Sequence, residues 1–233
     1  MARKRTRGRS VNGVFLLDKP FGLSSNHALQ RVRRLFDANK AGHTGSLDPL
    51  ATGVLPICLG EATKFSQFLL DAEKGYRSTF SLGLRTESGD VDGGEVSRID
   101  ASNITLEQIE QAVETFRGDI QQVPSMYSAL KHQGKKLYEL AREGKQVERA
   151  ARRVSVYDAR LLSFEGTAFE LEVSCSKGTY IRTLAEDIGH ALGCGAHISQ
   201  LRRLKTGPFD GDAMWTLEAL EALASQADRE AEL

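Results

Sequence analysis

The sequence predicts an α+β protein in which helices flank a mixed, largely antiparallel sheet. Apolar residues spaced for helices and apolar residues alternating as in strands are interspersed along the chain, and several strand candidates are joined by short turns. A parallel sheet would instead require a regular alternation of strand and helix. The 233 residues, of which 40% are hydrophobic, can bury a substantial core without disulfides.

The first elements follow a basic N-terminal arm. Residues 1–10 contain five basic side chains and no acidic one, and we expect a flexible arm. Residues 13–18 form an apolar run typical of a buried strand, and a turn follows at 19–22. A helix then begins at Ser24 or Ser25, because these apolar positions have helical spacing: Ala28, Leu29, Val32, Leu35 and Phe36.

The middle of the chain combines loops, strands and helices. Residues 41–53 show neither period and predict an ordered, glycine-rich loop. Thr105 and Gln108 can form a capping box at the start of a helix. The predicted strands are 54–59, 76–82 and 126–130, and the predicted helices are 61–70, 105–118 and 137–143.

The C-terminal part predicts a hairpin, two helices and a further strand. Strands at 154–164 and 169–175 join across Glu165-Gly166, with clean alternation in the second. A helix at 179–192 ends before Gly193. We expect a strand at 198–204, a helix at 217–225, a single domain over 11–225 and a frayed acidic tail at 226–233.

Several protein classes are excluded by missing motifs. The three cysteines form no C-x-x-C pair, and no secretory signal or apolar run of about 18 residues occurs. The chain lacks a P-loop, a dinucleotide-binding G-x-G-x-x-G, an H-E-x-x-H metal motif and a G-x-S-x-G elbow. We therefore expect a reduced cytoplasmic protein that uses neither a metal nor an organic cofactor.

The charges are balanced in number but segregated along the chain. Lysine plus arginine and aspartate plus glutamate each total 31, yet basic residues cluster at 1–10, 31–34, 131–153 and 202–205. Segregated basic clusters on a neutral chain favour a polyanionic partner, although such clusters also occur on ordinary solvated surfaces.

Two segments contain residues suited to catalysis. The loop HTGSLDPLATG offers His43 and Asp48 among small residues that allow close backbone approach to a ligand, but Asp48-Pro49 also suits an ordinary turn. Arg182, in KGTYIRTL, could pair with a carboxylate and keep it ionised, or simply be exposed. Tyr76, taken alone, fits a core position better than a catalytic one.

Three blocks of sequence resemble a known family. LLDKPFGLSS (16–25), AGHTGSLDPLATGVLPICLGEATKF (41–65) and SKGTYIRTLAEDIG (176–189) resemble the signature blocks of the TruB family. These enzymes are bacterial tRNA pseudouridine synthases that act on uridine 55 in the T loop. Residues 120–144 and 194–209 resemble the family too, so the resemblance runs in order from about residue 11 to 225.

The resemblance implies a role for individual residues. Asp48 matches the catalytic aspartate, Arg182 its ion-pair partner, and Tyr76 the aromatic that stacks on the target base and is placed to move a proton in the sugar. His43 matches the histidine that helps hold the extruded loop, and Leu201 an apolar residue of the pocket. Three further matches are assigned to substrate binding: Tyr180, Lys64 and Asp90. Lys19 and Pro20 match a motif that supports the catalytic loop.

The implied reaction agrees with the rest of the sequence. Pseudouridylation exchanges one glycosidic bond for another, so it needs a carboxylate but no cofactor. The target base must be flipped out of folded RNA. Basic clusters would then bind phosphate, and we assign backbone contacts to the following residues: Arg31, Lys131, Lys135, Lys136, Arg202 and Arg203.

Other interpretations stay open from the residues alone. An RNA-binding module with little turnover could use the same basic clusters, and a sugar- or nucleotide-binding α+β protein would need no RNA. Bacterial relatives usually carry a small C-terminal RNA-binding domain, which we expect to be absent here. We further expect a monomer acting on the T-arm stem-loop of tRNA.

Overall fold

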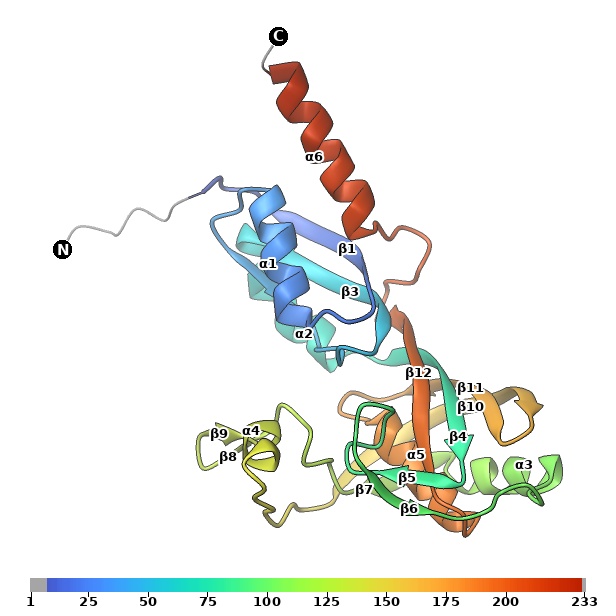
Figure 1. The fold of residues 1–233 in the computed structure, drawn as a ribbon. Helices are drawn as coiled ribbons and strands as arrows, with labels where there is room; N and C mark the ends of the chain where they lie inside the picture. The colour runs from blue at the N-terminus through green and yellow to red at the C-terminus, as the bar shows by residue number, and fades with distance from the viewer. Residues whose placement is uncertain (1–7, 232–233) are drawn as a thin grey trace. The chain divides into compact units, whose positions relative to one another are not determined.

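The computed structural model describes residues 8–231, and at 227–231 only the course of the backbone (Figure 1). It divides into two compact units, of which the first holds residues 8–76 and 202–231 and the second holds 77–201. Strands β4 (Lys74–Leu82) and β12 (Ala196–Thr206) continue from one unit into the other. Most of the predicted basic arm, residues 1–7, lies outside the described residues.

The first unit contains a small mixed sheet. Strand β1 (Gly13–Lys19) pairs antiparallel with β3 (Thr52–Leu59) in unbroken register from Gly13 opposite Leu59 to Lys19 opposite Gly53. The short strand β2 (Ala41–His43) also pairs antiparallel with β3, whereas β12 pairs parallel with it at Arg203 opposite Gly53. Nearly every residue of β3 is buried, as its continuous apolar sequence predicts.

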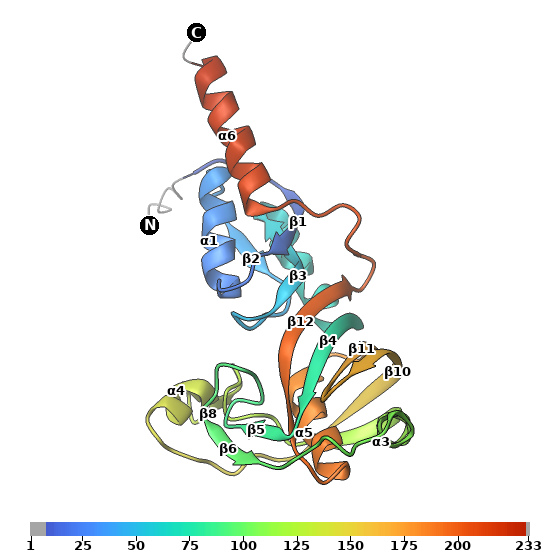
Figure 2. The same cartoon turned by 45° about the vertical axis from the view of Figure 1, so that its right-hand side comes forward.

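Two helices pack together beside this sheet. Helix α1 (Ser25–Leu35) begins where the Ser24 hydroxyl accepts the His27 amide, and it lies alongside α6 (Leu217–Ala231) (Figure 2). Helix α6 continues beyond the predicted end at residue 225, because the following Gln-Ala-Asp-Arg-Glu-Ala residues favour helix. The shared core contains these side chains: Leu17, Ala28, Val32, Leu55, Ile57, Leu217 and Leu220.

The predicted helix at 61–70 is divided in the structure. A 3-10 helix, η1 (Gly60–Phe65), precedes a short α-helix, α2 (Ser66–Asp71). The hydroxyls of Thr63 and Ser66 each donate to the carbonyl three residues earlier, at 2.8 Å in both cases. Such side-chain bonds compete with regular helix hydrogen bonding, which accounts for the tighter first turn.

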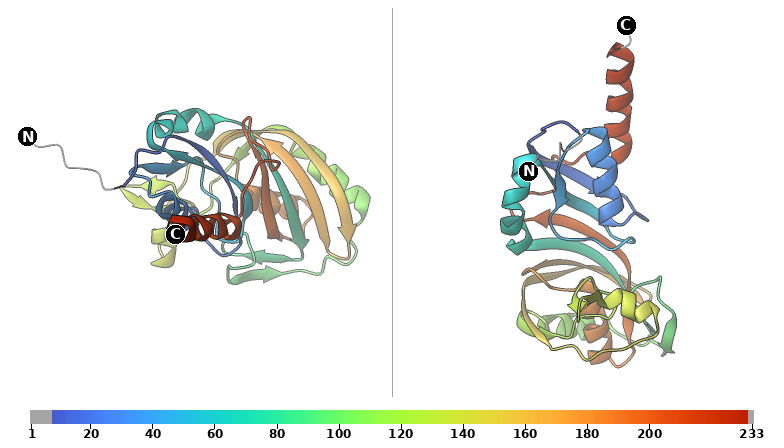
Figure 3. Two further views of the ribbon diagram at one scale, coloured as in Figure 1. Left: turned by 90° about the horizontal axis from the view of Figure 1, so that it is seen from above. Right: turned by 90° about the vertical axis from the view of Figure 1, so that its left-hand side faces the viewer.

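In the second unit the strand order is β12-β4-β11-β10-β7. Strands β10 (Arg152–Glu165) and β11 (Ala168–Cys175) form the predicted antiparallel hairpin, and β7 (Gly118–Gln122) pairs antiparallel with β10. Helix α3 (Leu106–Thr115) packs against β10 and against α5 (Ile181–Ala191), and the left panel of Figure 3 shows α3 beside the hairpin.

The predicted strand at 126–130 is wrong. Those residues form turns, and the strand lies earlier, in β7. The sequence of β7, GDIQQ, lacks apolar alternation because it is the terminal strand in the sheet order. Pro124, which cannot donate a ladder hydrogen bond, follows β7 closely.

A small irregular region joins β7 to β10. It contains the strand pair β8 (Lys131–His132) and β9 (Lys135–Lys136), followed by helix α4 (Leu137–Arg142), and has its own apolar cluster of Met126, Leu137 and Leu140. Another pair, β5 (Leu84–Thr86) with β6 (Glu95–Arg98), was not predicted. The two units together confirm the α+β class with a mixed, largely antiparallel sheet flanked by helices.

Candidate active site

Asp48 lies on a tight turn between β2 and β3. The amide of Ala51 donates to the Asp48 carbonyl at 3.0 Å, and Pro49 follows Asp48 as is typical of a turn with aspartate at its first position. Leu47 and Leu50 on either side are buried, whereas Asp48 is half-buried. The buried side chains of Leu47 and Leu50 anchor the turn, and Asp48 lies between them in the sequence.

Helix α1 and the turn before it hold this loop. The Ser25 hydroxyl accepts the Leu47 amide at 2.7 Å and donates to the Leu47 carbonyl at 3.0 Å. The Gly22 amide donates to the Pro49 carbonyl at 2.8 Å. Both backbone positions flanking Asp48 are therefore tied to the same neighbouring segment.

Lys19 is fully buried and contacts the Asp48 loop through a hydrogen bond to the Pro49 carbonyl. Its ammonium donates to the carbonyls of Pro20, Leu23 and Pro49 at 2.9, 2.7 and 3.3 Å. Burial lowers the pKa of Lys19 to about 8; the Asp48 carboxylate opposes this and the Arg203 charge adds to it. Pro20, which precedes the turn, thus contributes an acceptor for the same ammonium.

Arg203 is not a surface cation, so its predicted contact with an RNA backbone is wrong. Its side chain is only 1% exposed on β12. Nε donates to the Val54 carbonyl at 2.7 Å and Nη2 to the Gly45 carbonyl at 3.1 Å. Sequence reasoning missed this role because alternate residues of a strand face opposite sides, and the sequence does not tell which side is buried.

His43, Tyr76 and Lys64 also belong to the first unit. His43 on β2 is half-buried, and burial, with a smaller effect of the Arg203 charge, lowers the pKa of its imidazole. Its Nδ1 is buried and has no hydrogen-bond partner among the described residues. Tyr76 is half-buried on β4, and Lys64 is largely exposed and paired with Glu61.

Arg182 lies in the second unit, one residue into α5, and is 4% exposed. Nη1 donates to the Ser88 carbonyl at 2.8 Å and Nη2 to the Tyr127 carbonyl at 3.0 Å. The Asp90 carboxylate lies 3.7 Å from Nη1, and it accepts the Ser88 hydroxyl at 2.5 Å. The predicted cation thus has a carboxylate neighbour, Asp90, within its own unit.

Tyr180 and Leu201 complete the predicted set in this unit. Gln122 accepts the Tyr180 amide at 3.0 Å and donates to the Tyr180 carbonyl at 3.2 Å, which holds the residue before α5. Gln122 is 2% exposed, and no sequence motif had indicated it. Leu201 is 8% exposed on β12.

The structure thus groups the predicted residues by unit. In the first unit, Lys19 donates a hydrogen bond to Pro49 in the Asp48 loop. Burial, and to a smaller extent the Arg203 charge, lowers the pKa of His43. In the second, Arg182 and Asp90 lie together.

The other basic residues predicted to contact RNA differ in whether, and with what, their side chains are paired. Arg31 pairs with Glu221. Arg202 forks onto the Asp18 carboxylate at 3.0 and 2.8 Å. In the irregular region of the second unit, Lys131 is exposed, Lys135 lies 3.3 Å from Glu143, and the Lys136 ammonium lies 5.3 Å from the Tyr138 ring centre.

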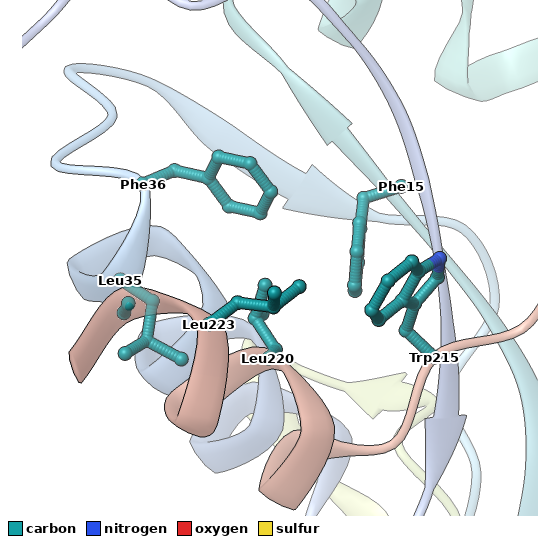
Figure 4. A pocket seen from close by; sticks show the side chains of 7 residues that line it. Phe15, Leu35, Phe36, Trp215, Leu220 and Leu223 are labelled. Atoms are coloured by element: carbon teal, nitrogen blue, oxygen red, sulfur yellow. The ribbon is translucent and has the colours of Figure 1, made fainter. Parts of the chain in front are cut away.

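An apolar hollow of about 410 Å³ opens in the first unit between β1, α1 and α6. Figure 4 shows Phe15, Trp215 and Leu220 lining it, together with Leu35, Phe36 and Leu223. Its lining has no titratable group, so it offers nothing for acid–base chemistry. Over residues 8–231, no helix is both long and apolar enough to span a membrane.

Comparison with known proteins identifies the class of this fold. A chain of a Cbf5-Nop10-Gar1 complex is 30% identical, with a TM-score of 0.73 over 97% of this chain and 64% of that chain. A chain of an H/ACA RNP bound to a substrate RNA containing 2′-deoxyuridine is 29% identical, with a TM-score of 0.71 over 98% and 62%. The chain spans less than two thirds of these solved chains. The family model that matches residues 33–181 describes a pseudouridylate synthase, so sequence and fold together define the class of pseudouridine synthases.

The chain belongs to the TruB family of pseudouridylate synthases. The model of the N-terminal domain of that family matches residues 33–181, and that of the tRNA pseudouridylate synthase B C-terminal domain matches 182–233. A tRNA pseudouridine synthase B of Chromohalobacter salexigens is 65% identical over all of this chain and 75% of its own length. One of Yersinia pestis is 60% identical over 99% and 71%. The resemblance seen in the sequence is confirmed.

Proposed function

We propose that this chain converts uridine 55 in the T loop of tRNA to pseudouridine, with Asp48 as the catalytic carboxylate. The observation that carries the proposal is the Asp48 turn, anchored by buried leucines and tied to Lys19 and Ser25. A rigid loop keeps a reactive carboxylate in one place. Family membership and the named relatives support tRNA as the substrate.

The reaction breaks the N1–C1′ bond of the uridine and joins C1′ to C5 of the same uracil. C5 loses a proton and N1 gains one, so the balance involves neither oxidation nor an added group. Asp48 acts at the sugar, either as a nucleophile at C1′ or as the base of a glycal route. The site must also retain the detached uracil until it has turned.

The other residues bind and orient the flipped nucleotide. Flipping costs a few kcal/mol, and stacking on Tyr76 returns roughly 1–3 kcal/mol. His43, whose buried Nδ1 has no partner among the described residues, helps hold the extruded loop. Arg182 is the counter-charge that the family resemblance implies for Asp48. The residues assigned to the nucleotide pocket are Leu201, Tyr180, Lys64 and Asp90.

The proposal extends to the organisation of the protein. Residues 11–225 form the catalytic domain, and the protein acts as a monomer on tRNA in the cytoplasm. The solved relative bound to a substrate RNA supports an RNA-facing site in this fold.

Tritium release tests the proposal. A T-arm stem-loop carrying [5-³H]uridine at the target position is incubated with the parent, with Asp48→Asn and with Asp210→Asn, an exposed aspartate of the same unit. We expect release from the parent and Asp210→Asn and none from Asp48→Asn, with RNA binding retained by all three. Turnover by Asp48→Asn within about tenfold of the parent, about 1.4 kcal/mol, would contradict the role of Asp48.

A further inference from the structure

The Arg203 side chain joins the two ends of the loop that carries Asp48. Its Nη2 donates to the Gly45 carbonyl and its Nε to the Val54 carbonyl, one on each side of Asp48 in the chain. We propose that Arg203 is a positioning residue for the Asp48 carboxylate. The inference rests on the proposed function, because it takes Asp48 as the reacting group.

The backbone of Arg203 holds the end of the same loop. Arg203 lies opposite Gly53 in the parallel pairing of β12 with β3. The approach is so close that a Cβ on Gly53 would lie 2.1 Å from the Arg203 carbonyl oxygen. Gly53 has a φ of +101°, which a residue with a side chain rarely adopts. One residue therefore fastens the loop by both its backbone and its side chain.

A guanidinium is better suited to this task than an ammonium, because the Gly45 and Val54 carbonyls are met by two different nitrogens of one planar group, whereas an ammonium such as that of Lys19 binds carbonyls gathered around a single atom. The guanidinium is a planar fork whose donors can reach two carbonyls at once, whereas a lysine presents one flexible charged group. The Arg203 side chain is 1% exposed, and two of its nitrogens donate to backbone carbonyls, so the two carbonyls and the guanidinium determine each other's position. Burial lowers the pKa of His43 and of Lys19, and the Arg203 charge adds a smaller effect in the same direction.

The test separates positioning from charge and from folding. Arg203→Lys keeps the charge and removes the fork, and Arg203→Met removes both. The matched control is Arg33→Lys, because Arg33, in the last turn of α1, also forks onto two backbone carbonyls, those of Ala38 and Asn39 at 3.0 and 3.1 Å, which follow α1 in the chain. Each variant is assayed for single-turnover tritium release at saturating RNA, for RNA affinity, and for hydrogen exchange of amides 44–54.

We expect kcat of Arg203→Lys to fall by about 10²-fold, the effect of misplacing a reacting group by about 1 Å. RNA affinity should stay within about threefold of the parent, and exchange should quicken at 44–54 but not in β1 or α1. Arg33→Lys should keep its kcat within about twofold, because its fork lies away from the loop.

Four results would overturn the proposal. The first is an unchanged kcat and an unchanged RNA affinity in folded Arg203→Lys. The second is an unchanged kcat with weakened RNA affinity, which indicates an RNA contact. The third is faster exchange throughout the unit, which indicates a general structural role. The fourth applies if neither variant folds: the hydrogen-bonded loop amides of Thr44, Leu47 and Ala51 in the parent must then exchange as slowly as those of β3, and fast exchange contradicts the proposal. An inactive parent would refute the proposed function, while the exchange comparison would still test the loop.

Discussion

The carboxylate of Asp90 lies 3.7 Å from the guanidinium of Arg182, and both side chains are almost completely buried. Arg182 also donates hydrogen bonds to the carbonyls of Ser88 and Tyr127. Asp90 in turn accepts the hydroxyl of Ser88 and the amide of Asp92. Arg182 is therefore held in one orientation by a carboxylate that is itself fixed.

Asp90→Asn should lower kcat by about tenfold or more and should lower RNA affinity by a smaller factor. The change removes the negative charge of Asp90 beside a buried cation, which is costly and lets Arg182 reorient. Single-turnover tritium release and urea unfolding measure the two effects. Asp92→Asn, at an exposed neighbouring carboxylate, is the control and should behave as the parent. An Asp90→Asn protein with the parental kcat would show that Asp90 does not orient a group used in the reaction.

Lys131→Gln should weaken RNA binding more than Lys135→Gln does. Lys131 is exposed, whereas Lys135 shares its charge with Glu143. Losing one phosphate contact reduces the slope of log affinity against log salt by about one. Filter binding at salt concentrations that span about 0.1 M ionic strength measures this slope for the parent and for each variant. Equal slopes for the parent and Lys131→Gln would exclude Lys131 as a phosphate contact.

Gly53→Ala should destabilise the protein more than Gly166→Ala. Both glycines have positive φ, but a Cβ at Gly53 would collide with Arg203, and one at Gly166 meets nothing within 4 Å in the described part of the chain. The positive φ alone costs an alanine about 1–2 kcal/mol. Urea unfolding gives the difference between the variants, which isolates the collision. Equal losses would mean that β12 can move away from the loop freely.

The parent should lose stability on mild acidification partly through His43. Burial first, and the Arg203 charge second, lower the pKa of His43 in the folded state. As the pH falls through 6.5, the unfolded chain takes up this proton before the folded protein does, so the free energy of unfolding decreases. Between pH 7 and 5.5 the parent should lose more than His43→Gln. Parallel curves for the two proteins would show that His43 titrates normally.

Elements with strong local patterns were predictable from the sequence. The hairpin of β10 and β11, the Ser24 cap of α1 and the capping box of α3 appear as expected, because each depends on neighbouring residues. Strand β7 was missed because it is polar and is held by pairing with β10. Its hydrogen-bond partners are distant in sequence, and no local period records them.

The sequence by itself determined the family and the loop that carries Asp48, because both are contained in contiguous motifs. Arg202 and Arg203 are adjacent and chemically identical in the sequence, and only the tertiary structure assigned them different roles. Successive side chains of a strand face opposite sides, so Arg202 forks onto Asp18 while Arg203 is buried against the Asp48 loop. The side that becomes buried depends on how β12 pairs with β3, and that pairing forms only when the chain folds.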